Sequence, residues 1–240
     1  GDSHMRDWKR RVVLPREFRV PGSDMRLPSA PTLTVAAGLA AMALAFFSND
    51  GAENHPVSEP SAKRLSTAIF AGGCFWCVEA DFDKVEGVFD TVSGYTGGEL
   101  ANPTYEQVSK ENTGHYEAVK ILFDPSVVSR ESLLKLFIRS IDPTDAGGQF
   151  CDRGAPYRSA IFVSNKGEKA LAERIKSEAQ VALGRTIVTP ILDATTFYKA
   201  EDYHQDYYKG DNLVLTRFGP LRQSKAYKRY RTACGRDARV

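Results

Sequence analysis

The chain has 240 residues, of which 42% are hydrophobic and 26% are charged, an ordinary composition for a globular protein. Its net charge of +2 gives no electrostatic basis for nucleic-acid binding, which needs a clustered basic surface. Four cysteines in a chain of this length exclude a small fold built on disulfides, so each cysteine is interpreted in its own context.

The N-terminal part of the chain is not expected to belong to the fold. The first residues, GDSHM, resemble an expression-tag remnant, and a basic stretch follows, so residues 1–24 are interpreted as leader. Residues 25–64 hold an apolar run, LTVAAGLAAMALAFF, and a polar linker. The run is shorter than the roughly 20 residues of a membrane-spanning helix and resembles a secretory signal. A working signal would make the protein periplasmic or membrane-anchored; otherwise it is cytoplasmic.

A single folded domain is expected over residues 65–240. Apolar and β-branched runs bounded by Gly or Pro predict strands, and apolar residues at helical spacing predict helices. The predicted strands cover residues 67–71, 87–98, 115–123, 157–164 and 186–193, the last at a sheet edge because it holds a proline. The predicted helices run from Cys74 to Gly87, over 133–141 and over 167–183. This order predicts an α+β domain with helices against a mixed or largely antiparallel sheet.

The stretch AGGCFWCVE places Cys74 directly after a strand and two glycines, at the first turn of a helix. A helix N-terminus favours negative charge, so this position predicts a lowered thiol pKa and an exposed thiolate. Cys77 lies one turn further in, which makes Cys74 the better nucleophile. The alternative is a buried, inert cysteine.

Phe75 and Trp76 stand between the two cysteines. Consecutive helical positions point about 100° apart, so both rings cannot easily bury against one sheet. At least one is expected to form a wall beside the thiol, although both could simply be core residues.

Two other kinds of site use a C-x-x-C pair. A thioredoxin-like redox site is disfavoured by the order of the elements and by the two aromatic residues between the cysteines. A structural zinc site needs four ligands, and no second C-x-x-C or H-x₃₋₅-H partner occurs. In zinc deaminases the H-x-E motif comes first, whereas here His115 and Glu117 follow the cysteines. No metal site is predicted.

Further polar residues flank the predicted strands. Tyr105 lies in a predicted loop, Glu117 begins a strand, Asp152 and Tyr157 surround a glycine loop, and His204 lies in an aromatic and acidic segment. Each alone would be an ordinary surface or half-buried residue. Together they lie where enzymes gather a site on a rigid sheet.

Six motifs, in this order, resemble type A peptide methionine sulfoxide reductases: GGCFWCVE, SGYTGG, NPTYEQV, TGHYEAV, FCDRGAPYRSAIF and FYKAEDYHQDYY. The resemblance covers residues 66–236. It implies an α+β fold with a two-layer, ferredoxin-like sheet core and long loops around the site. It also implies reduction of the S epimer of methionine sulfoxide, free or in proteins, without a cofactor other than an external reductant, thioredoxin or dithiothreitol.

The resemblance also implies roles for individual residues. Cys74 matches the nucleophile, and Phe75 and Trp76 match the pocket for the substrate methyl group. Glu117 matches the acid near the sulfoxide oxygen. The remaining matches are the hydrogen-bonding tyrosines Tyr105 and Tyr157, a substrate-holding Asp152 and a supporting His204. Burial would keep such a glutamate protonated near neutral pH.

A second thiol must condense with the sulfenic acid formed on Cys74. Cys234, on a basic tail expected to be mobile, and Cys77, where the family often has glycine, are both candidates. Cys151 is expected to be a buried bystander. The partners expected are methionine sulfoxide and thioredoxin, with a monomeric chain. The rival hypothesis is a membrane-tethered protein that recognises oxidised methionine without turnover.

Overall fold

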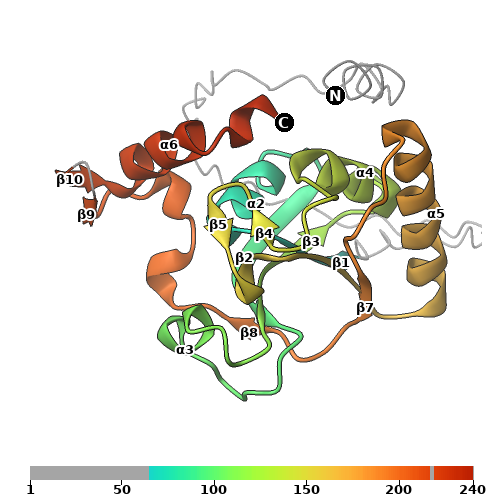
Figure 1. Ribbon diagram of the computed structural model, residues 1–240, viewed down its shortest axis with the longest axis horizontal. Coiled ribbons are helices and arrows are strands. Elements are labelled where there is room, and N and C mark those ends of the chain that lie inside the picture. The colour runs from blue at the N-terminus through green and yellow to red at the C-terminus, as the bar shows by residue number, and fades with distance from the viewer. Residues whose placement is uncertain (1–64, 217–218, 240) are drawn as a thin grey trace, which may run out of the picture. The chain divides into compact units, whose positions relative to one another are not determined.

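The computed structural model describes residues 65–216 and 219–239 (Figure 1). The predicted leader, signal-like segment and linker, residues 1–64, lie outside the described residues. Within the described ranges, no helix has the length and apolar character needed to cross a membrane.

A six-stranded sheet forms the centre of the domain. The strands are β1 (Ser66–Gly72), β2 (Val88–Thr96), β3 (Tyr116–Phe123), β6 (Ser159–Val163), β7 (Ile191–Asp193) and β8 (Tyr198–Lys199). Their order is β7-β6-β1-β3-β2-β8, with every pair antiparallel except β6–β7. The mixed sheet and the edge position of the proline-preceded strand are confirmed.

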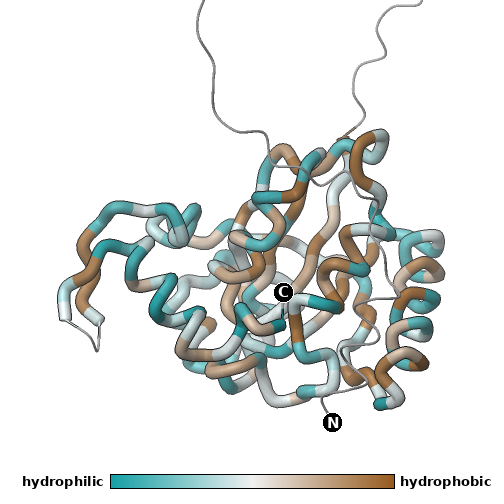
Figure 2. The backbone as a smooth tube through the Cα atoms, turned by 90° about the horizontal axis from the view of Figure 1, so that it is seen from above, coloured by the Kyte–Doolittle hydropathy of each residue, from teal (hydrophilic) through white to brown (hydrophobic). Residues whose placement is uncertain are grey.

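Three helices cover one face of this sheet. They are α2 (Phe75–Phe82), α4 (Arg130–Ser140) and α5 (Lys166–Leu183), close to the predicted ranges. Their apolar faces and alternate strand residues form one buried cluster, in which the rings of Phe70 and Phe137 stack 4.7 Å apart. Burying each such side chain stabilises the fold by roughly 1.5–3 kcal/mol. The polar residues of α5 face away from the cluster, so polar and apolar residues alternate along its turns (Figure 2).

The opposite face of the sheet carries a smaller apolar cluster. Ala71, Ala118 and Phe162 belong to it, whereas their chain neighbours Phe70, Val119 and Ile161 belong to the larger cluster. This alternation follows from the period of two along a strand. The result is the expected α+β domain with helices layered on a sheet.

Two segments differ from the prediction. NPTYEQV, expected as a loop, contains the helix α3 (Tyr105–Ser109), because Thr104 and Gln107 form a reciprocal capping box at its start. The C-terminal tail, expected to be mobile, forms α6 (Gln223–Ala233) and the 3-10 turn η4 (Arg236–Ala238). A hairpin of β9 (Leu213–Thr216) and β10 (Gly219–Arg222) precedes α6 and projects from the sheet (Figures 1 and 2).

The remaining short elements surround the carboxyl end of β1. They are β4 (Gly148–Gln149), β5 (Asp152–Arg153) and the 3-10 turns η1 (Ala155–Tyr157), η2 (Asp202–His204) and η3 (Tyr207–Lys209). The loop between β4 and β5 is joined to the end of α6 by a disulfide between Cys151 and Cys234, with a Cα–Cα distance of 5.3 Å. Cys151 is therefore exposed and bonded, and its interpretation as a buried bystander is wrong.

Candidate active site

Cys74 lies at the junction between β1 and α2, as its N-cap residue. The turn needs a glycine at position 73, whose φ is +82°; an added Cβ there would stand 2.6 Å from the Cβ of Gln149. This junction places Cys74 at the helix start, directly after the glycine that packs against Gln149 of β4. The position predicted from the sequence is confirmed.

The thiols of Cys74 and Cys77 are hydrogen-bonded to one another. That bond, burial, and the negative charges of Cys77, Glu117 and Asp152 raise the pKa of Cys74 well above its ordinary value. Only 6% of Cys74 is exposed. The expected exposed thiolate at Cys74 is therefore wrong: without substrate this thiol is protonated. The same hydrogen bond lowers the pKa of Cys77, and two nearby arginines add to the effect.

Glu117 lies on β3 and is buried behind the helix start. Its Oε2 accepts a 3.0 Å hydrogen bond from the backbone N–H of Phe75, the residue next to Cys74. Burial outweighs that bond and raises the pKa of Glu117 to about 8. At neutral pH the carboxyl group is protonated and can donate a proton next to Cys74.

The hydroxyls of Tyr105 and Tyr157 are hydrogen-bonded to each other although the residues come from α3 and η1. Burial and the charge of Glu117 raise the pKa of Tyr105 to about 12, and that of Tyr157 is raised by the same causes. Both tyrosines therefore keep their protons. Asp152 accepts a hydrogen bond from Tyr230 of α6, and burial raises its pKa.

Trp76 is a half-buried aromatic side chain of the site. Its ring stacks on Tyr207 with centroids 3.7 Å apart, and its Nε1 donates a 3.2 Å hydrogen bond to Nδ1 of His204. Phe75 is fully buried, with its ring against Tyr95 and His204. Trp76 thus forms the wall predicted beside the thiol, and Phe75 lies in the core behind it.

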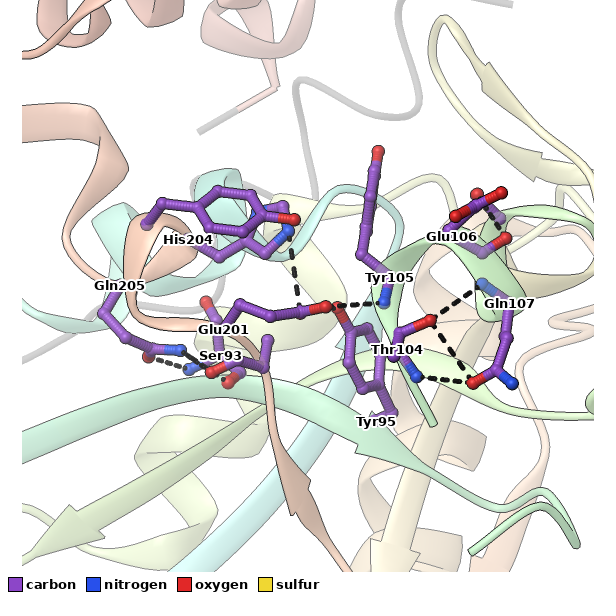
Figure 3. A network of polar contacts seen from close by, with 12 residues as sticks. Ser93, Tyr95, Thr104, Tyr105, Glu106, Gln107, Glu201, His204 and Gln205 are labelled. Atoms are coloured by element: carbon purple, nitrogen blue, oxygen red, sulfur yellow. Dashed lines mark hydrogen bonds and ion pairs between the residues drawn. The ribbon is translucent and has the colours of Figure 1, made fainter. Parts of the chain in front are cut away.

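Glu201 organises this side of the site and was not found from the sequence (Figure 3). Its two oxygens accept hydrogen bonds from the hydroxyl of Tyr95, at 2.9 Å, and from the backbone N–H of Tyr105, at 2.8 Å. It also lies 3.9 Å from Nε2 of His204. Burial lowers the pKa of His204 to about 4 against the opposing charge of Glu201, so the histidine that accepts from Trp76 is neutral.

The C-terminal segment, residues 223–239, supplies further side chains that the sequence did not reveal. Tyr230 bonds Asp152, Arg231 donates to the carbonyl of Cys77 at 3.4 Å, and Arg236 donates to the carbonyl of Gly72 at 2.9 Å. The only signal for them was a basic tail. Cys234, one candidate for the second thiol, is bonded to Cys151, whereas Cys77, the other, contacts Cys74.

Metal binding finds no support in residues 65–216 and 219–239, which contain no cluster of His, Cys, Asp and Glu suited to a metal ion. The arrangement consists of a paired thiol, a protonated carboxyl and two tyrosine hydroxyls. Such a set can protonate an oxygen while sulfur attacks beside it.

Comparison with known proteins gives a consistent result. Residues 66–233 match the sequence model of a family described as peptide methionine sulfoxide reductase. The chain is 49% identical to peptide methionine sulfoxide reductase MsrA 2 of Caulobacter vibrioides, over 75% of this chain and 86% of that protein. It is 50% identical to the MsrA protein of Bacillus subtilis, over 73% of this chain and 93% of that protein.

Solved structures are similar too. The reduced form of Mxr1 from Saccharomyces cerevisiae matches with a TM-score of 0.58 and 30% identity, over 62% of this chain and 86% of that one. Methionine sulfoxide reductase A of Corynebacterium diphtheriae matches with a TM-score of 0.54 and 32% identity, over 62% and 75% of the two chains.

Proposed function

The chain belongs to the peptide methionine sulfoxide reductase family, and we propose that within it Cys74 is the attacking thiol and Glu117 the proton donor. It is a peptide-methionine (S)-S-oxide reductase, and its reaction is the thiol-dependent reduction of methionine sulfoxide, a repair of oxidative damage. The observation that carries the assignment of roles is the position of Glu117. Its buried carboxyl group, with a pKa raised to about 8, accepts a hydrogen bond from the backbone N–H of Phe75, next to Cys74.

The first step is attack at sulfur with protonation at oxygen. Oxide is a very poor leaving group, so the sulfoxide oxygen takes the proton of Glu117, with the hydroxyls of Tyr105 and Tyr157 as further donors. The bond between the Cys74 sulfur and the substrate sulfur then breaks together with the substrate sulfur–oxygen bond, as the protonated oxygen passes to the Cys74 sulfur and the sulfide leaves as methionine. The proton that Cys74 gives up replaces the one that Glu117 donated. The net change is that a sulfoxide and a thiol have become a sulfide and a sulfenic acid.

Substrate binding is assigned to the aromatic side of the site. Trp76, held by Tyr207 and His204, supplies an apolar surface for the substrate methyl group, and Phe75 supports it from the core. Asp152, bonded to Tyr230, faces the same thiol and orients the substrate or the tyrosines.

The second step is assigned to Cys77. Its sulfur already contacts Cys74, whereas Cys234 is occupied in the bond to Cys151. Attack of Cys77 on the sulfenic acid forms a disulfide and releases water. A dithiol reductant of the thioredoxin type, or dithiothreitol, then returns both thiols. The monomeric state, and the localisation that residues 25–50 would direct as a signal, remain predictions.

A turnover assay on a chiral aryl methyl sulfoxide with dithiothreitol tests the assignment. We expect the S epimer to be reduced and Cys74→Ser to be inactive. Dithiothreitol can reduce the sulfenic acid directly, so with thioredoxin in its place we expect Cys77→Ser to release one sulfide per enzyme and stop. Equal reduction of both epimers would contradict the type A assignment, and normal turnover of Cys77→Ser with thioredoxin would return the second step to Cys234.

A further inference from the structure

The guanidinium group of Arg236 is buried, and some of its hydrogen-bond donors have no acceptor. Only 2% of the residue is exposed, and Nη1 donates to the carbonyl of Gly72 at 2.9 Å. Nε and Nη2 have no hydrogen-bond partner, and Nε lies 3.8 Å from Oδ2 of Asp81. A buried donor without a partner costs about 1–3 kcal/mol, and more when it is charged. Such a group marks a place where negative charge is expected.

Asp81 does not fully supply that charge, because it already binds another cation. Its Oδ1 lies 2.7 Å from Nη2 of Arg231. Arg231 also pairs with Asp237 at 2.5 Å, but that carboxylate is half exposed and lies at the outer end of the cluster. Two buried guanidinium groups therefore share one fully buried carboxylate, Asp81, and the half-buried carboxyl of Asp152 is the other negative group that acts on Arg236.

The charge of the two arginines also acts on the sulfur of Cys77. Cys77 and Asp81 are four residues apart on α2, so they lie on the same face of the helix. After the larger effect of the hydrogen bond from Cys74, Arg236 and Arg231 both act to lower the pKa of Cys77. The titratable and charged groups around this sulfur are Cys74, Asp81, Glu117, Tyr227, Tyr230, Arg231 and Arg236.

The disulfide fixes the two segments that enclose Arg236. Cys234 precedes Arg236 by two residues, and Cys151 directly follows Phe150. The guanidinium lies over the ring of Phe150, 5.0 Å from its centroid. The covalent bond therefore joins the backbone that carries the cation to the backbone that carries its aromatic support.

We propose that Arg236 is a positioning residue for the second thiol step, whose guanidinium compensates charge on the Cys77 sulfur and is kept in place by the Cys151–Cys234 disulfide. The inference rests on the proposed function, in which Cys77 attacks the sulfenic acid on Cys74. In that step a sulfur–sulfur bond forms and the sulfur–oxygen bond of Cys74 breaks. The hydroxide that leaves combines with the proton given up by Cys77 to form water, so one thiol is oxidised as the sulfenic acid is reduced.

Arg236→Met tests the proposal by removing the charge at similar length, and Lys228→Met removes a charge from the exposed face of the preceding helix, α6, as a control. The enzyme is prepared with Cys74 and Cys77 reduced and with the Cys151–Cys234 disulfide intact. It is mixed with one equivalent of an S-configured aryl methyl sulfoxide without reductant. Sulfide release and formation of the Cys74–Cys77 disulfide are followed separately, by quenched-flow chromatography and mass spectrometry, across pH 6–9.

For Arg236→Met we expect sulfide release at the rate of the unmodified enzyme. Disulfide formation should slow about tenfold at pH 7, with its pH profile displaced by about one unit to the alkaline side, because one unit of pKa changes the thiolate fraction tenfold. Arg236→Lys should restore most of the profile, and Lys228→Met should match the unmodified enzyme in both steps. A purely structural role would slow both steps and leave the pH profile in place.

A second variant keeps the proposal open to refutation if Arg236→Met does not fold. Cys151→Ser combined with Cys234→Ser removes the disulfide, and its pH profile for disulfide formation should show the same alkaline displacement. An unchanged profile in either variant overturns the proposal. Failure of the proposed function would be seen separately. If Cys77→Ser still resolves the sulfenic acid normally, the assignment of Cys77 as the second thiol is refuted, and this result does not depend on Arg236.

Discussion

Replacing Glu117 by glutamine removes the proton from the candidate donor and leaves its shape. The amide oxygen can still accept the hydrogen bond that Phe75 N–H now donates at 3.0 Å, so the helix start keeps its partner. The amide cannot protonate a sulfoxide oxygen. Cys74, Tyr105 and Tyr157 remain, so substrate should still bind.

The size of the effect follows from the role of the group. A positioned general acid contributes typically about 10²–10⁴ in rate, which corresponds to about 2.7–5.4 kcal/mol of transition-state stabilisation. With a pKa of about 8, about nine-tenths of Glu117 carries its proton at pH 7 and about one-tenth does at pH 9. Activity of the unmodified enzyme should therefore fall about tenfold for each pH unit above 8.

The assay is kcat and KM for an S-configured aryl methyl sulfoxide with dithiothreitol, measured between pH 6 and 9. We expect Glu117→Gln to lower kcat by at least about 100-fold at pH 7 with little change in KM, and to lose the alkaline fall. A variant that keeps its rate within about threefold, or keeps the fall above pH 8, would refute the assignment of Glu117 as the proton donor.

Three further outcomes are expected. Glu79 is fully buried with a pKa raised to about 8 by desolvation, so the folded state binds its proton more tightly than the unfolded state and stability falls as pH rises from about 4.5 to 8. Glu79→Gln should remove that fall in the free energy of unfolding, which is on the order of a few kcal/mol, as measured by urea titrations at pH 6 and pH 9. An equal change between the two pH values in the variant and the unmodified protein would contradict the argument. Tyr157→Phe should lower kcat by about tenfold. The double variant with Tyr105→Phe should lower kcat by less than the product of the two single losses, because the two hydroxyls share a hydrogen bond. Losses that multiply strictly would count against a shared role. Gly73→Ala should destabilise the fold by about 2 kcal/mol or more, because φ is +82° and the new Cβ meets Gln149 at 2.6 Å, and an unchanged thermal midpoint would show that the turn can relax.

Local pattern predicted most of the fold. The strand before Gly72 and the three long helices were predicted from apolar spacing, and the structure adds caps at the two ends of α5, Asn165 and Gly184. The α3 helix was missed because its five residues are too few for a periodic signal, and only the capping residues indicated it. The tail was called mobile because its basic sequence does not reveal the buried partners of Arg231 and Arg236.

The site was predicted by position more reliably than by charge. Helix geometry and strand ends located Cys74 and Glu117, and both lie together in the structure. The protonation of the two thiols could not be predicted, because it depends on the hydrogen bond between them, on burial and on arginines more than 150 residues away in the chain. The same distance hid Glu201 from the sequence, since its partners Tyr95 and Tyr105 are brought to it only by the fold.

The Cys151–Cys234 bond also bears on the stability of the whole domain. It closes a loop of 83 residues, and restricting the unfolded chain by that much corresponds to about 4.5 kcal/mol on the loop-entropy account. Domains of this size are commonly stable by only about 5–15 kcal/mol. The oxidised and reduced forms of this one bond should therefore differ widely in resistance to unfolding, so the redox state of the surroundings sets how long the enzyme lasts as well as how it is recycled.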